Sequence, residues 1–191
     1  MKNIKKKYTI KIPNNVTVLY CNTKQILTII GPLIKKSLKL KVKISILKNK
    51  NLIIISSEPF SPTSNYKKHT SLALQGTTTA LIKQLILETS YTLYKKLKLI
   101  GVGYRAFDVE NFENKLLSIK LGYSHPIYFK ISKKSKIFCL KKTKLFIYGN
   151  FYKNITQEAA FIRAYKKPEP YKGKGILYDN EKIILKEGKK L

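Results

Sequence analysis

The stretch KIPNNVTVLYCNTKQILTIIG, residues 11–31, indicates the fold of this chain because a second stretch repeats its pattern. Residues 130–149 read KISKKSKIFCLKKTKLFIYG, and with one residue dropped in the first turn Leu19-Tyr20-Cys21 aligns with Ile137-Phe138-Cys139. In each copy apolar and polar residues alternate on either side of a polar turn, which predicts two short strands. The repeat therefore predicts two related modules in one chain.

A segment with helical spacing follows each copy of the repeat. Residues 72–93 and, over a shorter length, residues 157–164 place apolar side chains on one side of a helix. Thr70-Ser71 and Thr156 are the expected capping residues, since their hydroxyls can accept hydrogen bonds from the first free N–H groups. Pro168 is expected to stop the second helix. The apolar side of the longer helix is predicted to consist of Leu74, Leu81, Leu85, Ile86 and Leu93.

These patterns predict an α+β fold of two duplicated small domains, each an antiparallel-rich sheet packed with one helix. The first domain is expected to cover residues 1–95 and the second residues 96–167. Residues 168–191 are rich in Lys and Gly, and we expect them to form a basic C-terminal extension.

The charge of the chain points to a polyanionic partner. Of 191 residues, 39 are Lys or Arg and 10 are Asp or Glu, which gives a formal net charge of +29. No acidic residue precedes Glu58 and none lies between Glu113 and Glu158, so the predicted hairpins carry lysines without counter-charges. A hydrophobic content of 43% excludes a disordered basic tail. Nucleic acid is the expected partner.

Composition also bears on the compartment. Cys21 and Cys139 form no CxxC pair, and we expect both to be small buried hydrophobes in a reducing compartment. No apolar run is long enough for a spanning helix, and residues 1–7 lack the features of a targeting sequence, so a soluble protein is expected.

All basic residues except Arg105 and Arg163 are Lys, and this bias, with abundant Ile, Asn and Tyr, indicates an AT-rich coding sequence.

Two glycine-rich segments are similar to nucleotide-binding motifs but lack their context. Residues 101–106, GVGYRA, match a dinucleotide-binding turn, yet an alternating strand follows where a helix is required, and no acidic residue occurs from 114 to 157. Residues 171–175, YKGKG, lack the spacing of a phosphate-binding loop of nucleotide hydrolases. Their glycines, lysines and tyrosine suit contact with an RNA backbone instead.

The chain offers little for catalysis. His69 and His125 are far apart in sequence, and neither has a Cys or acidic residue at metal-site or triad spacing. The ten carboxylates are scattered, which disfavours a paired acid and base. We therefore expect no catalytic residues, metal ligands, cofactor or small-molecule substrate.

Three motifs in order carry a family resemblance. They are KLIGVGYRA at residues 98–106, LGYSHP at 121–126 and RAYKKPEPYKGKGILY at 163–178. Together they resemble the bacterial-type large-subunit ribosomal protein six family, densely over residues 96–187 and more thinly before. The resemblance implies two duplicated α+β domains. It also implies that the second domain is the main rRNA-binding part. With its extension, this domain is expected to dock on large-subunit rRNA near the sarcin–ricin loop and stalk base, among other ribosomal proteins and close to where translational GTPases bind.

Carried over by position, the resemblance implies an rRNA-binding set. The stronger members lie in the third motif and the weaker ones in the first two: Arg163, Lys166, Lys167, Tyr171, Lys172, Gly173, Lys174 and Gly175, then Tyr104, Arg105, Ser124 and His125. Two segments depart from the family pattern. Gly31-Pro32-Leu33 lacks the glycine-rich continuation, which puts RNA contacts by the first domain in doubt, and the acidic turn 108–114 is expected to face solvent or protein.

The sequence thus predicts a non-enzymatic structural protein of the large ribosomal subunit. A free RNA- or DNA-binding module acting away from ribosomes is the alternative. Peripheral membrane binding is disfavoured, because the longer predicted helix has Lys83 as its one inner basic residue. The predicted location is the mitochondrial ribosome, with the cytoplasm of an AT-rich bacterium or a plastid as alternatives.

Overall fold

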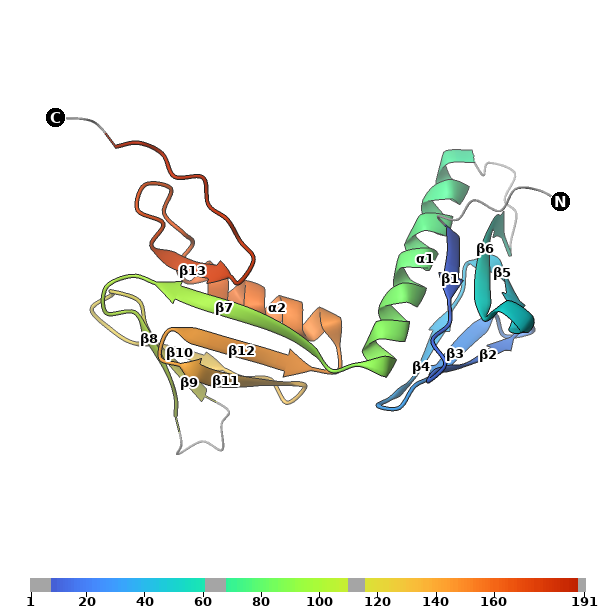
Figure 1. Cartoon of the computed structure of the whole chain (residues 1–191), viewed down its shortest axis with the longest axis horizontal. Helices are drawn as coiled ribbons and strands as arrows, with labels where there is room; N and C mark the ends of the chain where they lie inside the picture. The colour runs from blue at the N-terminus through green and yellow to red at the C-terminus, as the bar shows by residue number, and fades with distance from the viewer. Residues whose placement is uncertain (1–7, 61–67, 110–115, 189–191) are drawn as a thin grey trace. The chain divides into compact units, whose positions relative to one another are not determined.

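The computed structural model describes residues 8–60, 68–109 and 116–188 and divides the chain into two compact units (Figure 1). Unit 1 is Met1–Tyr91 and unit 2 is Thr92–Leu191. The expected boundary at 95/96 falls inside strand β7 (Leu93–Ile100), whose first residues pair with the rest of unit 2. In the part of the chain that is described, neither helix contains a stretch long and apolar enough to span a membrane.

The described residues of unit 1 form two three-stranded antiparallel sheets and one long helix. The first sheet has the order β2-β3-β4 and the second the order β1-β6-β5. A short 3-10 helix, η2 (Lys48–Lys50), joins β5 to β6. The other elements are β1 (Thr9–Lys11), β2 (Thr17–Cys21), β3 (Ile26–Ile30), β4 (Lys35–Lys39), β5 (Val42–Leu47), β6 (Leu52–Pro59) and α1 (Lys68–Ser90).

Helix α1 differs from its sequence pattern at both ends and on one side. It begins at Lys68, so Thr70-Ser71 lies inside its first turn, and it ends at Ser90, so Leu93 belongs to β7. Leu81 was expected on the buried side but is 45% exposed. The buried side is partly polar instead: Gln75 donates to the Ile55 carbonyl over 2.7 Å. Buried threonine hydroxyls bond to carbonyls of the helix itself, which allows polar residues to face the core.

Unit 2 repeats the plan with a four-stranded sheet, a three-stranded sheet and one helix. The sheet orders are β11-β12-β7-β13 and β10-β9-β8. Side chains from α2 and from both sheets share one core, which includes Leu97, Leu117, Leu145 and Ile162. The further elements are β8 (Arg105–Asp108), β9 (Leu116–Lys120), β10 (Ile127–Lys130), β11 (Ser135–Lys141), β12 (Lys144–Gly149), α2 (Tyr152–Ala164) and β13 (Gly175–Tyr178).

The duplicated α+β architecture predicted from the repeat is confirmed. The first copy forms the antiparallel hairpin β2-β3 and the second forms β11-β12. Helix α2 starts four residues before the expected cap, and the hydroxyl of Thr156 bonds to the Tyr152 carbonyl within the helix. The expected cap at Thr156 was wrong, because the helix already begins at Tyr152, before the apolar pattern that the sequence shows.

Two further expectations need correction. The basic extension 168–191 is not confirmed as a separate part, because β13 is a buried strand paired with β7 in the sheet of unit 2. Cys139 is half-buried as expected, but Cys21 is exposed, since it lies at the end of β2 with its side chain toward solvent. Most of the acidic turn 108–114 falls outside the described residues.

Candidate nucleic-acid interface

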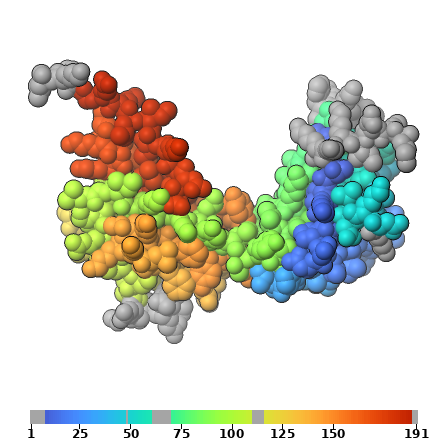
Figure 2. All heavy atoms as spheres, viewed as in Figure 1, coloured from blue at the N-terminus to red at the C-terminus, as the bar shows by residue number. Residues whose placement is uncertain are grey.

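The segment that follows α2, residues 165–175, folds into a braced loop, here called the basic loop. The Glu169 N–H donates to the Lys174 carbonyl over 2.9 Å, and the Gly173 N–H donates to the Glu169 carbonyl over 3.0 Å. A third backbone bond, from Ile176 to the Lys166 carbonyl, ties the loop to the start of β13. The loop and the chain after β13 appear as the red lobe of unit 2 in Figure 2.

The basic loop presents the predicted contact residues with different exposures. Lys167, Tyr171 and Lys172 are exposed, with 53% of Tyr171 accessible. Lys166 and Lys174 are half-buried. The braced loop can therefore bind an RNA backbone: its lysine side chains can contact phosphates, and the exposed ring of Tyr171 can contact a sugar or a base.

Gly175 is required by the geometry of this loop. Its φ is +152°, and a Cβ at this position would lie 2.6 Å from the Cα of Pro168. Gly173 has a φ of +67°, in the left-handed region that favours glycine. The two glycines therefore allow the close backbone approach between Gly175 and Pro168 that closes the loop.

The turn at residues 122–126, here called the histidine turn, lies against the basic loop. The hydroxyl of Tyr123 donates to the Tyr165 carbonyl over 3.1 Å, and the ammonium of Lys166 lies 4.3 Å from the centroid of the Tyr123 ring. Tyr123 also stacks with His125 at 6.1 Å between centroids. Ser124 and His125 are exposed. The fold thus brings the second and third sequence motifs together, through a tyrosine that was not predicted as a site residue.

Arg163 is held inside unit 2 by a carboxylate. Its Nε donates to Oε2 of Glu181 over 3.0 Å, its Nη2 donates to Oε1, and its guanidinium lies 5.4 Å from the Tyr178 ring centroid. The bond to Arg163 holds the pKa of Glu181 below its ordinary value, and the bond to Glu181 raises the pKa of Arg163. The charge of Arg163, which the resemblance implied to be an RNA contact, is thus paired within the protein, and Arg163 braces the chain on both sides of the basic loop.

Tyr104 and Arg105 have separate environments. Tyr104 is 8% exposed and belongs to the core, so its ring has no free face for a base. A Cβ on Gly101 would lie 2.7 Å from this ring, which explains the glycine there better than a nucleotide-binding turn does. Arg105 begins β8 on the surface, in the three-stranded sheet. Of the weaker candidates, Arg105, Ser124 and His125 remain exposed.

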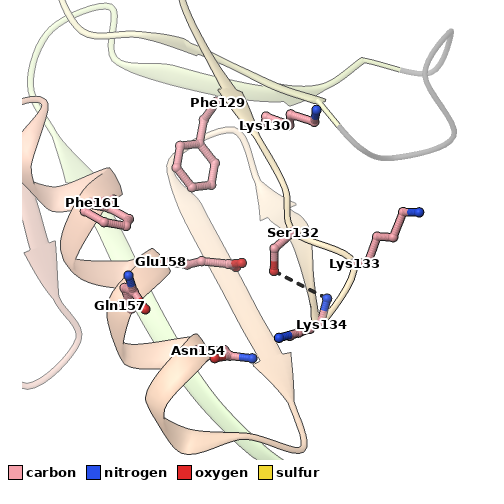
Figure 3. Close-up of a pocket in the computed structure, with 9 residues that line it drawn as sticks. All are labelled: Phe129, Lys130, Ser132, Lys133, Lys134, Asn154, Gln157, Glu158 and Phe161. Atoms are coloured by element: carbon pink, nitrogen blue, oxygen red, sulfur yellow. Dashed lines mark hydrogen bonds between the residues drawn. The ribbon is translucent and has the colours of Figure 1, made fainter.

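A hollow of about 400 Å³ lies between α2 and the segment that joins β10 to β11 (Figure 3). Lys130, Lys133 and Lys134 line it together with Phe161. Buried Glu158 bonds to Ser135 through Oε2, and its Oε1 has no hydrogen-bond partner among the described residues. In those residues no group of three His, Cys, Asp or Glu side chains could hold a metal ion. The hollow is thus lined by lysines and aromatic rings beside one buried carboxylate.

Comparison with known proteins extends beyond these motifs. Residues 100–179 match the family model described as Ribosomal protein L6. The chain is 39% identical over 184 residues to large ribosomal subunit protein uL6 of Mycoplasmoides gallisepticum, covering 94% of this chain and 92% of the relative. It is 36% identical over 184 residues to uL6 of Paramagnetospirillum magneticum, covering 96% and 97%. The resemblance seen in three motifs is thereby confirmed over both units: the chain belongs to the ribosomal protein L6 (uL6) family.

Proposed function

We propose that this protein is a structural component of the large ribosomal subunit and binds its rRNA through the basic loop and the histidine turn. The observation that carries the proposal is the contact of Lys166 with Tyr123, which joins two motifs into one exposed basic surface. The family is structural rather than enzymatic, which confirms the prediction of a non-enzyme.

We attribute RNA binding to lysines that neutralise phosphates and to a braced loop backbone that fits the shape of the RNA. Lys167 and Lys172 are exposed, and the braced backbone of the loop lowers the cost of ordering this segment on binding. Lysines contact phosphates without reading base identity, so specificity comes from the three-dimensional form of the RNA. Ser124 and His125 add hydrogen-bonding groups at the edge of the same surface.

The proposed place on the subunit is the rRNA near the sarcin–ricin loop and stalk base, with translational GTPases as neighbours. Family membership supports this place. For the compartment, the mitochondrial ribosome and the bacterial cytoplasm are the two main proposals, with a plastid third. The relatives named above are bacterial, which supports the second. Sequencing the DNA that flanks the gene would decide between them.

Sedimentation tests the proposal against a free nucleic-acid-binding module. The protein is expected to stay with large subunits through a high-salt gradient, whereas a free module with roughly 6–10 phosphate contacts loses about 10³ or more in affinity as salt rises to ~200 mM. Recovery in the soluble fraction alone would reject the ribosomal role.

A pair of double variants tests the assigned surface. Lys172→Ala/Lys174→Ala is expected to weaken incorporation into the large subunit more than the matched change Lys41→Ala/Lys43→Ala in unit 1. Each double variant removes two charges, so a difference reports the position of the lysines rather than the net charge. Equal effects would refute the assignment to unit 2.

A further inference from the structure

One face of the four-stranded sheet in unit 2 carries a continuous row of aromatic rings. Helix α2 packs on the opposite face, where Leu97, Leu145 and Ile147 are buried. In the row, the ring centroids are 5.2 Å apart for Tyr94 and Phe146, 5.8 Å for Phe146 and Tyr148, and 5.4 Å for Tyr148 and Phe138. We call this side the outer sheet face, defined by Tyr94, Lys96, Lys98, Lys136, Phe138, Lys144, Phe146 and Tyr148.

The two ends of the row are open to solvent. Tyr94 is 57% exposed and Phe138 is 43% exposed, whereas Phe146 and Tyr148 are half-buried between their neighbours. An aromatic ring favours a second flat group stacked on its free face. The outer sheet face therefore offers stacking positions at both ends of the row.

Lysines surround the rings on the same side of the sheet. The register places Lys96 opposite Phe146, Lys136 opposite Tyr148 and Lys98 opposite Lys144. The ammonium of Lys96 lies 5.4 Å from the centroid of Tyr94.

The counter-charge on this face is small. Strands β7, β11 and β12 contain no acidic residue. Asp179, in the turn after β13, forms an ion pair of 2.6 Å with Lys98. The face therefore presents rings among cations.

The combination of aromatic rings and lysines indicates which class of molecule the outer sheet face binds. Lysine is depleted from the centres of protein–protein interfaces, so a protein partner fits poorly. Double-stranded RNA keeps its base faces stacked inside the helix, where these rings cannot reach them. Unpaired bases on a phosphate backbone match both the stacking positions and the charge.

We infer that the outer sheet face binds a single-stranded RNA segment, with unpaired bases stacked on Tyr94 and Phe138 and phosphates beside the lysines. The inference rests on the proposed rRNA binding for the class of partner, but it adds a surface that shares no residue with the basic loop or the histidine turn. Aromatic pairs also stabilise a sheet without any ligand, so the test must separate binding from folding.

Binding by the full-length protein is the first test. The probes are a single-stranded oligoadenylate of about ten nucleotides and an RNA duplex of equal length. Tyr94→Leu/Phe138→Leu is expected to weaken binding of the single strand by about tenfold or more, since each stacked base contributes substantially, and to change duplex binding little. Tyr128→Leu is the matched control, because Tyr128 is 59% exposed on β10 in the other sheet. Equal losses for the control, or no loss for the double variant, would overturn the inference.

Crosslinking within assembled subunits is the second test, and it does not depend on the leucine variants folding. A photoreactive benzoylphenylalanine in place of Phe138 is expected to link to an rRNA nucleotide that is unpaired. A link to protein alone, or no link, in subunits that contain the protein would reject the outer sheet face as an RNA site. Absence of the protein from large subunits would instead reject the proposed function.

Discussion

The ammonium group of Lys36 in β4 contacts the carboxylate of Glu88 near the end of α1, and both side chains are largely buried. Gln84 donates to the other oxygen of Glu88 over 2.8 Å. The pair joins the β2-β3-β4 sheet of unit 1 to its helix. Removing one partner of a buried ion pair is strongly destabilising, so each partner depends on the other.

Replacing Lys36 with methionine is expected to lower the free energy of unfolding of unit 1 by about 3–5 kcal/mol, because the buried Glu88 carboxylate would lose the ammonium of Lys36. Hydrogen exchange of the α1 and β4 amides measures this loss. Lys36→Met/Glu88→Leu is expected to recover most of it. The control is Lys43→Met, since Lys43 pairs with Glu58 over 3.3 Å on the surface, and a change below about 1 kcal/mol is expected there. A loss in Lys43→Met as large as in Lys36→Met would contradict the role of burial.

Unit 2 is expected to lose stability in acid through Glu181. The Arg163 bond holds the pKa of Glu181 below the ordinary 4.5, so the ionised group stabilises the fold above that pH and the contribution disappears as pH falls through the lower, folded-state pKa. Glu181→Gln should therefore flatten the decline of the thermal unfolding midpoint below about pH 4.5. Glu187→Gln, at an exposed carboxyl, serves as control, and an unchanged acid profile in Glu181→Gln would count against the pairing.

Gly175→Ala is expected to destabilise the basic loop and β13 by about 1–3 kcal/mol, because the added methyl would meet the backbone of Pro168, which cannot move aside cheaply. Faster hydrogen exchange at Ile176 and Leu177 would report the loss. Gly188→Ala is the matched control, since a Cβ there meets nothing within 4 Å. If both variants exchange alike, the close approach does not constrain the loop.

The two cysteines are expected to differ strongly in reactivity. The hydrogen bond between Cys21 and Thr23 lowers the pKa of the exposed Cys21 thiol, whereas burial and the neighbouring Asp108 carboxylate raise the pKa of Cys139 to about 12. Iodoacetamide at mildly alkaline pH should therefore alkylate Cys21 first and leave Cys139 mostly unmodified. Mass spectrometry of Cys21→Ser and Cys139→Ser measures each thiol alone, and comparable rates would argue against these environments.

The sequence predicted what depends on local periodicity. Alternation over residues 17–30 and 135–149 encodes strands directly, so both hairpins were found. The start of α1 was missed because its first turn, around Lys68, has no apolar period to mark it. Membership of residues 93–95 in β7 depends on pairing with β12, which lies far along the chain.

In the candidate site, too, residues in one continuous stretch were predicted from the sequence, whereas features set by tertiary contacts were not. The glycines and lysines of the basic loop form one continuous stretch, so they could be named from the sequence. The pairing of Arg163 with Glu181 and the burial of Tyr104 are set by tertiary contacts that span many residues. Composition alone could not separate an arginine that braces the protein from one that contacts RNA.

The strand order of unit 2 has a consequence for the growing polypeptide. β7 is the first of the described strands of unit 2 in sequence order, yet it lies between β12 and β13, and β13 is the last of those strands. A nascent chain must therefore keep both edges of β7 unpaired while the intervening residues are translated, and such long-range pairing is slow. The backbone bond from Ile176 to Lys166 forms only when β13 docks. The basic loop consequently reaches its braced shape only after the residues from β7 to β13 have all been synthesised.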